Sequence, residues 1–327
     1  MRIENLNIFE DAALRAACRV EADANGQARP GWQGIGVEAR MIQWRADDGW
    51  SKHIHGAFDG STLLGFSASM TYQGDPDTSW IFVWVHPSHQ SQSVGSALVS
   101  TAELSSPPSA IRFVSSAYRR TSAELATLEQ RFAVPLGYAV ATTETVLELD
   151  LGSWTPFTPV VADGYVISTH INGVPEQLRK QVGQIKGLVD AEAPNGDLAW
   201  SESTISVDEY AQEIELWNAQ GSTVIESIAL DSRGDLAGWT CLVVAPTPSS
   251  PSHIEGTLVL RQHRGHRLGT SVKAASLDAA KRLGTAHRVR TSSDDQNARM
   301  HSINEALGFH AIEHESIYQK DRLSLRD

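Results

Sequence analysis

The segment at residues 261–269, RQHRGHRLG, carries three arginines and two histidines within seven residues, in a chain whose formal net charge is −12. It lies between an expected strand at 254–260 and an expected amphipathic helix at 269–283. The first amides of a helix have no intrahelical acceptor, and the helix dipole favours an anion there. Gly265 and Gly269 let a ligand approach the main chain. The segment therefore predicts a diphosphate site at 264–270, with a solvated basic loop as the alternative.

Long helices that alternate with short apolar strands surround this turn and predict a mixed α/β sheet. In the second half we expect helices near 174–192, 207–219 and 297–307, and strands near 222–230, 235–244 and 287–292. In the first half we expect a helix near 10–23 and strands near 53–58, 62–72 and 79–86. Leu268, Val272, Ala275, Ala279 and Leu283 recur at helical spacing, and Gly284 is a plausible helix end.

The two halves of the chain repeat one pattern. Three glycines in matching contexts recur at separations of 173, 174 and 171 residues: Gly65 with Gly238, Gly95 with Gly269, and Gly137 with Gly308. A Pro- and Thr-containing stretch at 150–164 separates the halves. We therefore expect two copies of one fold, at residues 1–152 and 153–327.

The turn resembles motif A of the GNAT acyltransferase superfamily, Arg/Gln-x-x-Gly-x-Gly/Ala between a strand and a helix. Arg264-Gly265-His266-Arg267-Leu268-Gly269 matches it, with Arg267 in place of the first glycine of the pattern. Downstream, Asn297-x-x-Met300-x-x-Ile303-Asn304-x-x-Leu307-Gly308-Phe309 keeps the spacing of a second family motif, with Asn304 at the usual Tyr. In the first copy, Gln90-Ser91-Gln92-Ser93-Val94-Gly95 departs further, and no Asn precedes Leu136-Gly137-Tyr138. The whole chain is similar to tandem GNAT proteins of actinobacterial type.

This resemblance implies two GNAT-like domains, each a mixed, mostly antiparallel twisted sheet flanked by helices. It implies acetyl-CoA as cosubstrate and direct transfer of the acetyl group to a primary amine of a small, possibly cationic, acceptor. The pantetheine would lie along the strand that ends with Leu258, Val259, Leu260 and Arg261. The diphosphate would lie on Arg264, Gly265, His266, Arg267, Leu268, Gly269 and Thr270, and Asn297 would be a polar residue on the cofactor side.

Aminolysis of a thioester needs a base that takes a proton from the ammonium, and a donor to the developing oxyanion. Several GNAT enzymes carry a carboxylate six residues before the motif A valine; that position here is His253, with Glu255 two residues later. Strand alternation would place both on one face with Thr257 and Val259, provided that no bulge intervenes. The same count from Val85 reaches Ser79, which cannot act as a base, so we expect catalysis in the second copy. Solvated positions at a strand end are the alternative for both residues.

On the leaving-group side, Asn304 can only hydrogen-bond the thiolate, because an amide is no proton donor of useful acidity. Tyr318 is a substitute acid, with a buried core tyrosine as the alternative. An acidic stretch at 190–197 falls where the family places acceptor-binding elements, and a solvated helix end is its other interpretation.

Composition excludes several other classes of function. Two cysteines, Cys18 and Cys241, cannot form a disulfide framework, and no signal-peptide segment or apolar run of about 20 residues occurs, so we expect a cytoplasmic protein without a membrane partner. The acidic balance disfavours nucleic acid as a partner. His53 and His55 lack a third ligand at suitable spacing, so we expect no metal. We expect a monomer or homodimer; a mycothiol-synthase-like acetyltransferase and a non-catalytic acyl-CoA-binding sensor or scaffold remain alternative functions.

Overall fold

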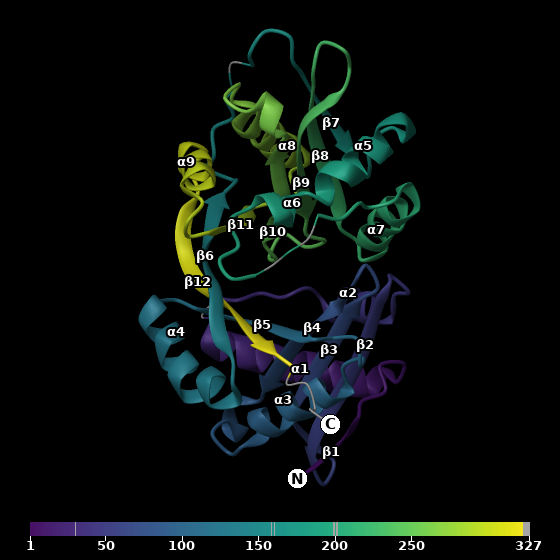
Figure 1. Cartoon of the computed structure of the whole chain (residues 1–327), viewed down its shortest axis with the longest axis vertical. Coiled ribbons are helices and arrows are strands. Elements are labelled where there is room, and N and C mark those ends of the chain that lie inside the picture. Colours follow the sequence, from purple (N-terminus) through teal and green to yellow (C-terminus); the bar gives the residue numbers. More distant parts are fainter. Residues whose placement is uncertain (30, 158, 160, 199, 201, 323–327) are drawn as a thin grey trace. The chain divides into compact units, whose positions relative to one another are not determined.

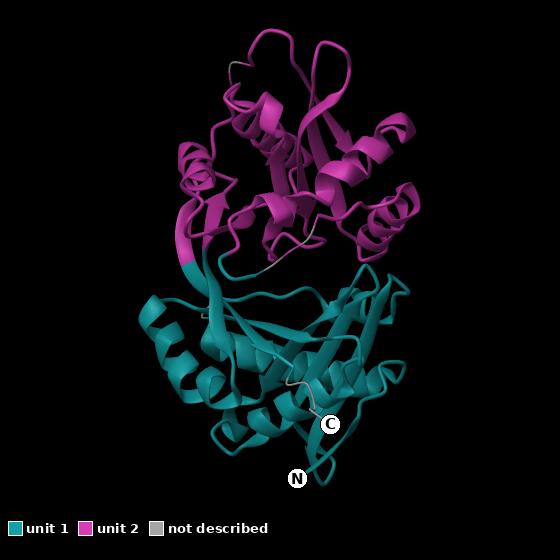
Figure 2. Ribbon diagram, viewed as in Figure 1, with its two compact units in different colours: residues 1–144, 196–198, 313–327 teal, residues 145–195, 199–312 magenta. Residues whose placement is uncertain are grey.

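A computed structural model describes residues 1–29, 31–157, 159, 161–198, 200 and 202–322. Contacts divide the chain into two compact units (Figure 2): unit 1 is Met1–Glu144, Gly196–Leu198 and Glu313–Asp327, and unit 2 is Thr145–Asn195 and Ala199–Ile312. These units differ from a division at residue 152, because the last strand of the chain pairs within unit 1 rather than with the rest of the second copy.

Unit 1 contains the elements of the first copy and the end of the chain (Figure 1). They are β1 (Arg2–Asn5), α1 (Asp11–Ala28), α2 (Val37–Arg45), β2 (Trp50–Asp59), β3 (Thr62–Tyr72), β4 (Asp75–Val85), α3 (Val94–Ser105), β5 (Arg112–Arg119), α4 (Ser122–Leu128), and parts of β6 (Ala139–Asp150) and β12 (His310–Asp321). The strand order is β1-β2-β3-β4-β5-β12-β6. Strands β4 and β5 pair in parallel, whereas the β1–β2, β2–β3, β3–β4 and β5–β12 pairs are antiparallel.

Unit 2 repeats this plan with the elements of the second copy. They are the second part of β6, β7 (Val166–Ile171), α5 (Glu176–Lys186), α6 (Val189–Glu192), α7 (Val207–Ala219), β8 (Thr223–Leu230), β9 (Leu236–Val244), β10 (Ser252–Val259), α8 (Leu268–Leu283), β11 (Arg288–Asp294) and α9 (Ala298–Ala306). The strand order is β7-β8-β9-β10-β11-β6, with β10 and β11 parallel. Both units are therefore mixed, mostly antiparallel sheets with helices, as expected.

Local sequence explains where several elements begin and end. The helix expected over 174–192 is divided into α5 and α6, with Gly187 between them. A Cβ atom at Gly187 would lie 2.1 Å from the Ser203 carbonyl oxygen, so this close approach requires glycine. Helix α8 ends at Gly284, whose φ of 74° is costly for other residues. Strand β1 and helix α2 were not expected from the sequence.

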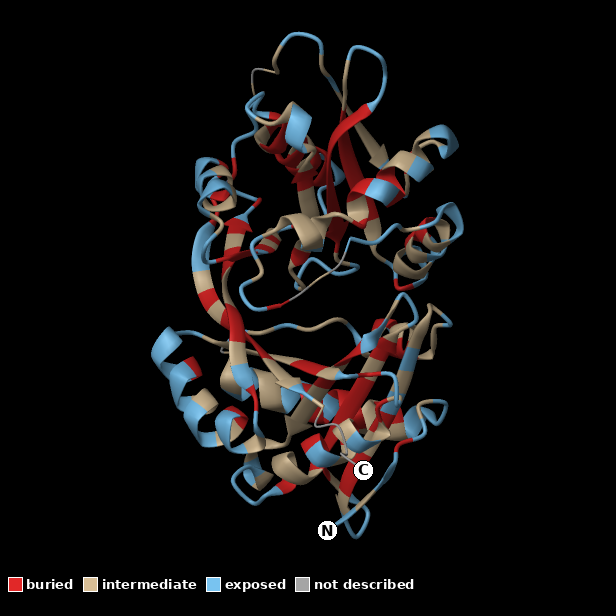
Figure 3. Ribbon diagram, in the orientation of Figure 1, coloured by how far each residue is buried: buried red, intermediate tan, exposed pale blue. Residues whose placement is uncertain are grey.

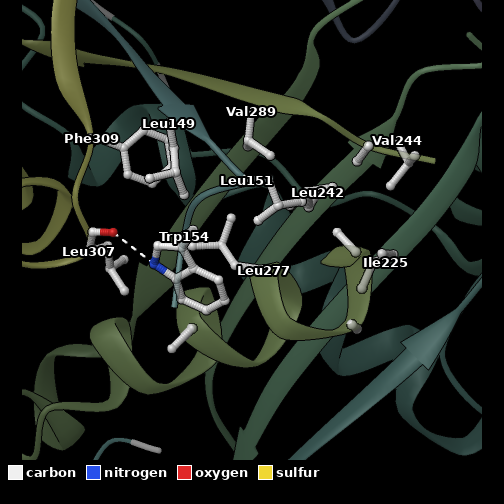
Figure 4. Packing of buried hydrophobic residues seen from close by; sticks show 14 of the residues in the cluster. Leu149, Leu151, Trp154, Ile225, Leu242, Val244, Leu277, Val289, Leu307 and Phe309 are labelled. Atoms are coloured by element: carbon white, nitrogen blue, oxygen red, sulfur yellow. Dashed lines mark hydrogen bonds between the residues drawn. The ribbon is translucent and has the colours of Figure 1, made fainter. Parts of the chain in front are cut away.

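The core of unit 2 fills the space between the sheet and its helices, and β9 is buried along its whole length (Figure 3). On the α8 side, Leu151, Leu242 and Leu277 pack together with Trp154 (Figure 4). The Trp154 indole N–H donates to the Leu307 carbonyl oxygen at 2.9 Å, which ties the start of the copy to the end of α9.

The parallel pair in each unit is short. Strands β10 and β11 pair only at Ser252–Val289 and His253–Arg290, although both strands continue. Strands β4 and β5 likewise pair only over Thr78–Trp80 and Arg112–Val114. Among the described residues, no further ladder pairs join the facing edges of these strands, so their main-chain groups there can bond to an extended ligand.

Candidate cofactor and acyl-transfer site

The turn between β10 and α8 presents a row of free backbone amides. Among the described residues, the N–H groups of residues 265–270 have no hydrogen-bond acceptor. Gly265 has φ 90° and Arg267 has φ 58°, and these left-handed conformations aim successive N–H groups to one side. A Cβ atom at Gly265 would meet nothing within 4 Å, so the space beside this main chain is open. The arrangement suits an anion with several oxygens.

Arg264 is held by protein groups instead of pointing freely toward that space. Its Nε donates to the Val259 carbonyl oxygen at 3.0 Å, and its guanidinium forms an ion pair with Glu192 of α6. Gln90 of the first copy donates in the same way to the Val85 carbonyl oxygen, five residues earlier. Arg and Gln thus share a role at this position: each shapes the turn by donating to the preceding strand.

Glu192 also pairs with Arg261 at 3.2 Å, and only 11% of its side chain is exposed. The acidic stretch therefore contributes one carboxylate to the turn, which the sequence did not suggest. His266 and Arg267, whose amides belong to this row, have exposed side chains. His263 is engaged by the Tyr165 hydroxyl at 3.0 Å from its Nδ1.

A bulge in β10 changes which side chains share a face. The register with β9 shifts between Ile254 and Gly256, so Glu255 has no partner on β9. His253 and Glu255 form an ion pair, but Thr257 bonds to Thr240 and Val259 packs on α8. The expectation that all four residues share one face is wrong, because the extra residue inverts the alternation after Glu255.

The His253–Glu255 ion pair lies at the bulge in β10, with 39% and 34% of the two side chains exposed. Desolvation lowers the pKa of His253, but the Glu255 carboxylate outweighs it and raises that pKa above its ordinary value. Burial raises the pKa of Glu255, but the His253 imidazolium outweighs it and the pKa is lowered. The Trp217 ring lies edge-on to His253 at 5.6 Å. A carboxylate stabilised by an imidazolium can accept a proton and return it.

A buried polar network, not expected from the sequence, supports this face. Glu226 is fully buried and accepts from the Tyr210 hydroxyl and from the Trp239 indole N–H, the latter at 2.8 Å. Lys186 pairs with Glu213 and lies 5.6 Å from the Trp239 ring. In the sequence, Glu226 is the one charged residue within the apolar run TVIESIAL, and this pattern could have indicated a buried carboxylate.

Asn304 and Asn297 both have structural partners. Asn304 is fully buried; its Oδ1 accepts from Lys273 at 2.6 Å and its Nδ2 donates to Ser293 Oγ at 3.2 Å. Asn297 caps α9, with its Oδ1 accepting from the Met300 N–H at 3.1 Å. Lys273 is 1% exposed, and burial lowers its pKa to about 7. Lys273 is the only charged residue between 268 and 277, and this pattern could have indicated a buried lysine.

Tyr318 lies in unit 1, on β12, and not among the other candidates in unit 2. It packs with Phe113, Val99 and Tyr138, so its phenol belongs to the core of the first copy. Strand pairing within unit 1 causes this placement, which no local pattern indicates.

A cavity of about 490 Å³ lies beside α5 in unit 2. Its lining includes Gln181, Ile185, Leu188, Leu236 and Leu260. Leu260 directly precedes the turn, so the cavity adjoins the end of β10. The described residues contain no group of three metal-ligating side chains. Among them, no helix has the length and apolar character needed to span a bilayer.

Comparison with known proteins agrees with this geometry. The family model described as "Acetyltransferase (GNAT) family" matches residues 19–105 and 194–309. A search of curated proteins found no match. A solved tandem GNAT protein from the clavulanic acid biosynthesis pathway is similar, with 20% identity, a TM-score of 0.80, and 98% of each chain covered.

Two further structures share the fold. A GCN5-related N-acetyltransferase from Sphaerobacter thermophilus has 16% identity and a TM-score of 0.67, with 95% of this chain and 93% of that chain covered. A glucosamine N-acetyltransferase region of a fungal multi-domain β-N-acetylglucosaminidase has 12% identity and a TM-score of 0.65, with 97% and 38% covered. The family model spans more than half of this chain, and its members' common chemistry is acyl transfer. The chain therefore belongs to the acetyltransferase (GNAT) family and contains two GNAT folds in tandem.

Proposed function

We propose that unit 2 binds acetyl-CoA and transfers its acetyl group directly to a primary amine of a small acceptor. The observation that carries this proposal is the row of acceptor-free amides at residues 265–270. A diphosphate has enough oxygens to accept from several of them, and the dipole of α8 adds to the attraction. Exposed His266 and Arg267 supply further donors.

The unpaired edge of β10 suits the pantetheine arm. Residues 257–261 lie beyond the last pair with β11, so their main-chain groups on that side can bond to the amides of an extended ligand. In this proposal the diphosphate lies at the turn and the thioester lies near the bulge at Glu255. Because the bulge removes Glu255 from the β9 ladder, its N–H can donate to the oxyanion.

The acid–base chemistry follows from the pair beside the bulge. An acceptor that arrives as an ammonium must lose a proton before its nitrogen attacks the carbonyl carbon. Glu255 is ionised at neutral pH, since the His253 charge lowers its pKa, and the carboxylate takes that proton directly or through water. The C–N bond forms as the C–S bond breaks, and coenzyme A leaves as a thiolate. The second amine proton is released as the amide forms and passes through water to the thiolate.

A cationic acceptor fits the same face. Glu213 and Glu255 both lie near Lys186, each with about a third of its side chain exposed, and the Trp217 ring stands next to His253. Carboxylates and an indole face attract an organic ammonium. We therefore infer an acceptor whose amine is charged in solution.

The test compares Gly265→Ala with the matched control Gly284→Ala. Both glycines have positive φ and open space beyond the missing Cβ, so alanine should introduce similar backbone strain at each. They lie at opposite ends of α8. Only Gly265→Ala alters the proposed diphosphate site. We expect at least tenfold weaker binding of acetyl-CoA to Gly265→Ala by titration calorimetry, and normal binding to Gly284→Ala. Equal binding to both variants would overturn the assignment.

Turnover is measured as thiol release from acetyl-CoA with a polyamine, an amino acid, a peptide amine, a cationic antibiotic and an amino-pseudodisaccharide. Turnover with the last acceptor alone would favour the mycothiol-synthase-like function. Tight binding with no turnover across the panel would favour a sensor or scaffold and contradict the proposed enzyme.

A further inference from the structure

Lys186, the last residue of α5, places its ammonium between two aromatic rings and a carboxylate. Its Nζ lies 5.6 Å from the centre of the Trp239 ring and 5.7 Å from the centre of the Tyr210 ring. It also forms an ion pair with Glu213 of α7, and only 12% of the Lys186 side chain is exposed. Ring faces and a carboxylate around one cation are the groups with which proteins bind organic ammonium ions. Tyr210, Trp239 and Glu213 thus form a cation box, and a side chain of the same domain fills it.

The cation box lies on the same face of the sheet as the proposed proton acceptor. Trp239 belongs to the core cluster that α5 and α7 form with β8, β9 and β10. Trp217 of α7 packs against this cluster and stands next to His253, the ion-pair partner of Glu255. The charge of Lys186 contributes to the lowered pKa of Glu255. An amine that gives its proton to Glu255 therefore lies within range of the Lys186 charge.

The carboxylates around the cation box are already matched by cations of the protein. Burial lowers the pKa of Lys186, but the Glu213 carboxylate outweighs burial and Glu226 adds to its effect, so this pKa is raised and the ammonium stays charged. Two other cationic side chains face this region: His253, and Arg179, which lies 6.0 Å from the centre of the Tyr210 ring. A second ammonium brought by a ligand would be desolvated there without gaining a free carboxylate, and like charges would repel it.

We propose that Lys186 determines the acceptor specificity of unit 2: it occupies the position of a second ammonium, so that the site accepts a monoamine and rejects a diamine or polyamine. An acceptor with one ammonium brings that group to Glu255 and presents a neutral body to Lys186. This inference rests on the amine acetylation proposed above, and it narrows the acceptor class to amines with a single positive charge.

Lys186→Met removes the internal cation and keeps most of the side chain. Methionine follows the lysine stem as far as Cε and lacks an atom at the position of Nζ. Glu213 has 35% of its side chain exposed and can be solvated, and Glu226 keeps its bonds from Tyr210 and Trp239, so we expect the variant to fold. Lys180→Met is the matched control, because Lys180 lies on the same helix and is exposed.

The experiment compares pentylamine with 1,4-diaminobutane, which have equal length and differ by a methyl group in place of the second ammonium. Thiol release from acetyl-CoA gives kcat/KM for each amine. We expect the wild type to favour pentylamine by about tenfold, and Lys186→Met to shift the ratio of the two values toward the diamine by about tenfold. Lys180→Met and Lys186→Arg, which keep a cation in the box, should retain the wild-type ratio.

Thermal unfolding without acetyl-CoA supplies a measurement that does not depend on turnover. 1,4-Diaminobutane should raise the Tm of Lys186→Met more than pentylamine does, because its second ammonium can enter the cation box. It should leave the Tm of the wild type and of Lys180→Met unchanged.

The two measurements separate this inference from the proposed function. A ratio of the two kcat/KM values that Lys186→Met leaves unchanged would overturn the inference and keep amine acetylation, as would a wild type that uses both amines equally well. Absence of turnover with both amines, together with a diamine-specific rise in the Tm of Lys186→Met, would contradict acyl transfer and support the exclusion of a second cation by Lys186. If Lys186→Met does not fold, the neutral and polar Lys186→Gln takes its place, and the wild-type ratio tests the inference by itself.

Discussion

Replacing Lys273 by Met should make the chain more stable at neutral pH and less stable at alkaline pH. Lys273 is 1% exposed, and among the described residues no carboxylate lies within ion-pair distance of its Nζ. Burial lowers its pKa from the ordinary 10.5 to about 7. That difference corresponds to about 4–5 kcal/mol of destabilisation of the charged form in the folded state.

The sign of the pH dependence follows from the protons bound. Between pH 7 and 10.5 the unfolded chain holds a proton on Lys273 and the folded chain does not, so wild-type stability rises with pH across this range. Below pH 7 the whole cost is present, and above 10.5 it is absent. At pH 7 the substitution removes about 4 kcal/mol of this cost. It also leaves Asn304 Oδ1 without its donor, which costs about 1–3 kcal/mol at any pH.

The net expectation is a gain of about 1–3 kcal/mol in unfolding free energy at pH 7, and a loss of about 0–2 kcal/mol near pH 10, where about 1 kcal/mol of the cost of the charged lysine remains. Urea unfolding at pH 6, 7, 8, 9 and 10 measures both. The double variant Lys273→Met, Asn304→Leu removes the orphaned acceptor and should be more stable than the single variant at every pH. A difference between wild type and Lys273→Met that does not change with pH would refute the reasoning, because a lysine charged in both states contributes no slope.

Two further substitutions test local features of unit 2. Arg267→Gly should raise the unfolding free energy by about 1 kcal/mol, because φ 58° is strained for any residue with a Cβ. Thermal unfolding measures this gain. The control Arg267→Ala keeps the strain and should show no such gain. Trp154→Phe should lower the unfolding free energy by about 1–3 kcal/mol, since it removes the donor to the Leu307 carbonyl oxygen and part of a buried ring. A change below about 0.5 kcal/mol in urea unfolding would contradict the stabilising role of the Trp154 indole.

Much of the architecture was predictable because it depends on local periodicity. The spacing of Leu268, Val272 and Ala279 predicts α8, and Gly284 ends it as expected, with φ 74°. The glycine pairs predicted two copies of one fold, and both units have the mixed, mostly antiparallel sheet that the family resemblance implied. The turn at 264–270 was found because main-chain conformation there depends on glycine and on the start of a helix.

Side-chain roles were less predictable, because they depend on neighbours far away in the sequence. The charge of Arg264 suggested a phosphate ligand, but its guanidinium is held by Val259 and Glu192. Alternation along β10 failed at Glu255, because a bulge depends on the pairing of two strands and not on the residues of one. Lys273 and Glu226 were missed, since a charged residue on a helix or strand is usually solvated and only packing makes it buried.

By itself, the sequence determined the family, the repeat and the position of the turn between β10 and α8, because these rest on residue type and on short, regular spacing. The tertiary structure alone decided which residues meet across strands. The last strand pairs with β5, so Tyr318 and Glu315 belong to unit 1 rather than to the copy that encodes them. The partner of a strand is set by the free energy of the whole sheet, so a segment distant in the sequence can take the place of a nearer one, and the pattern of residues within one strand does not indicate which.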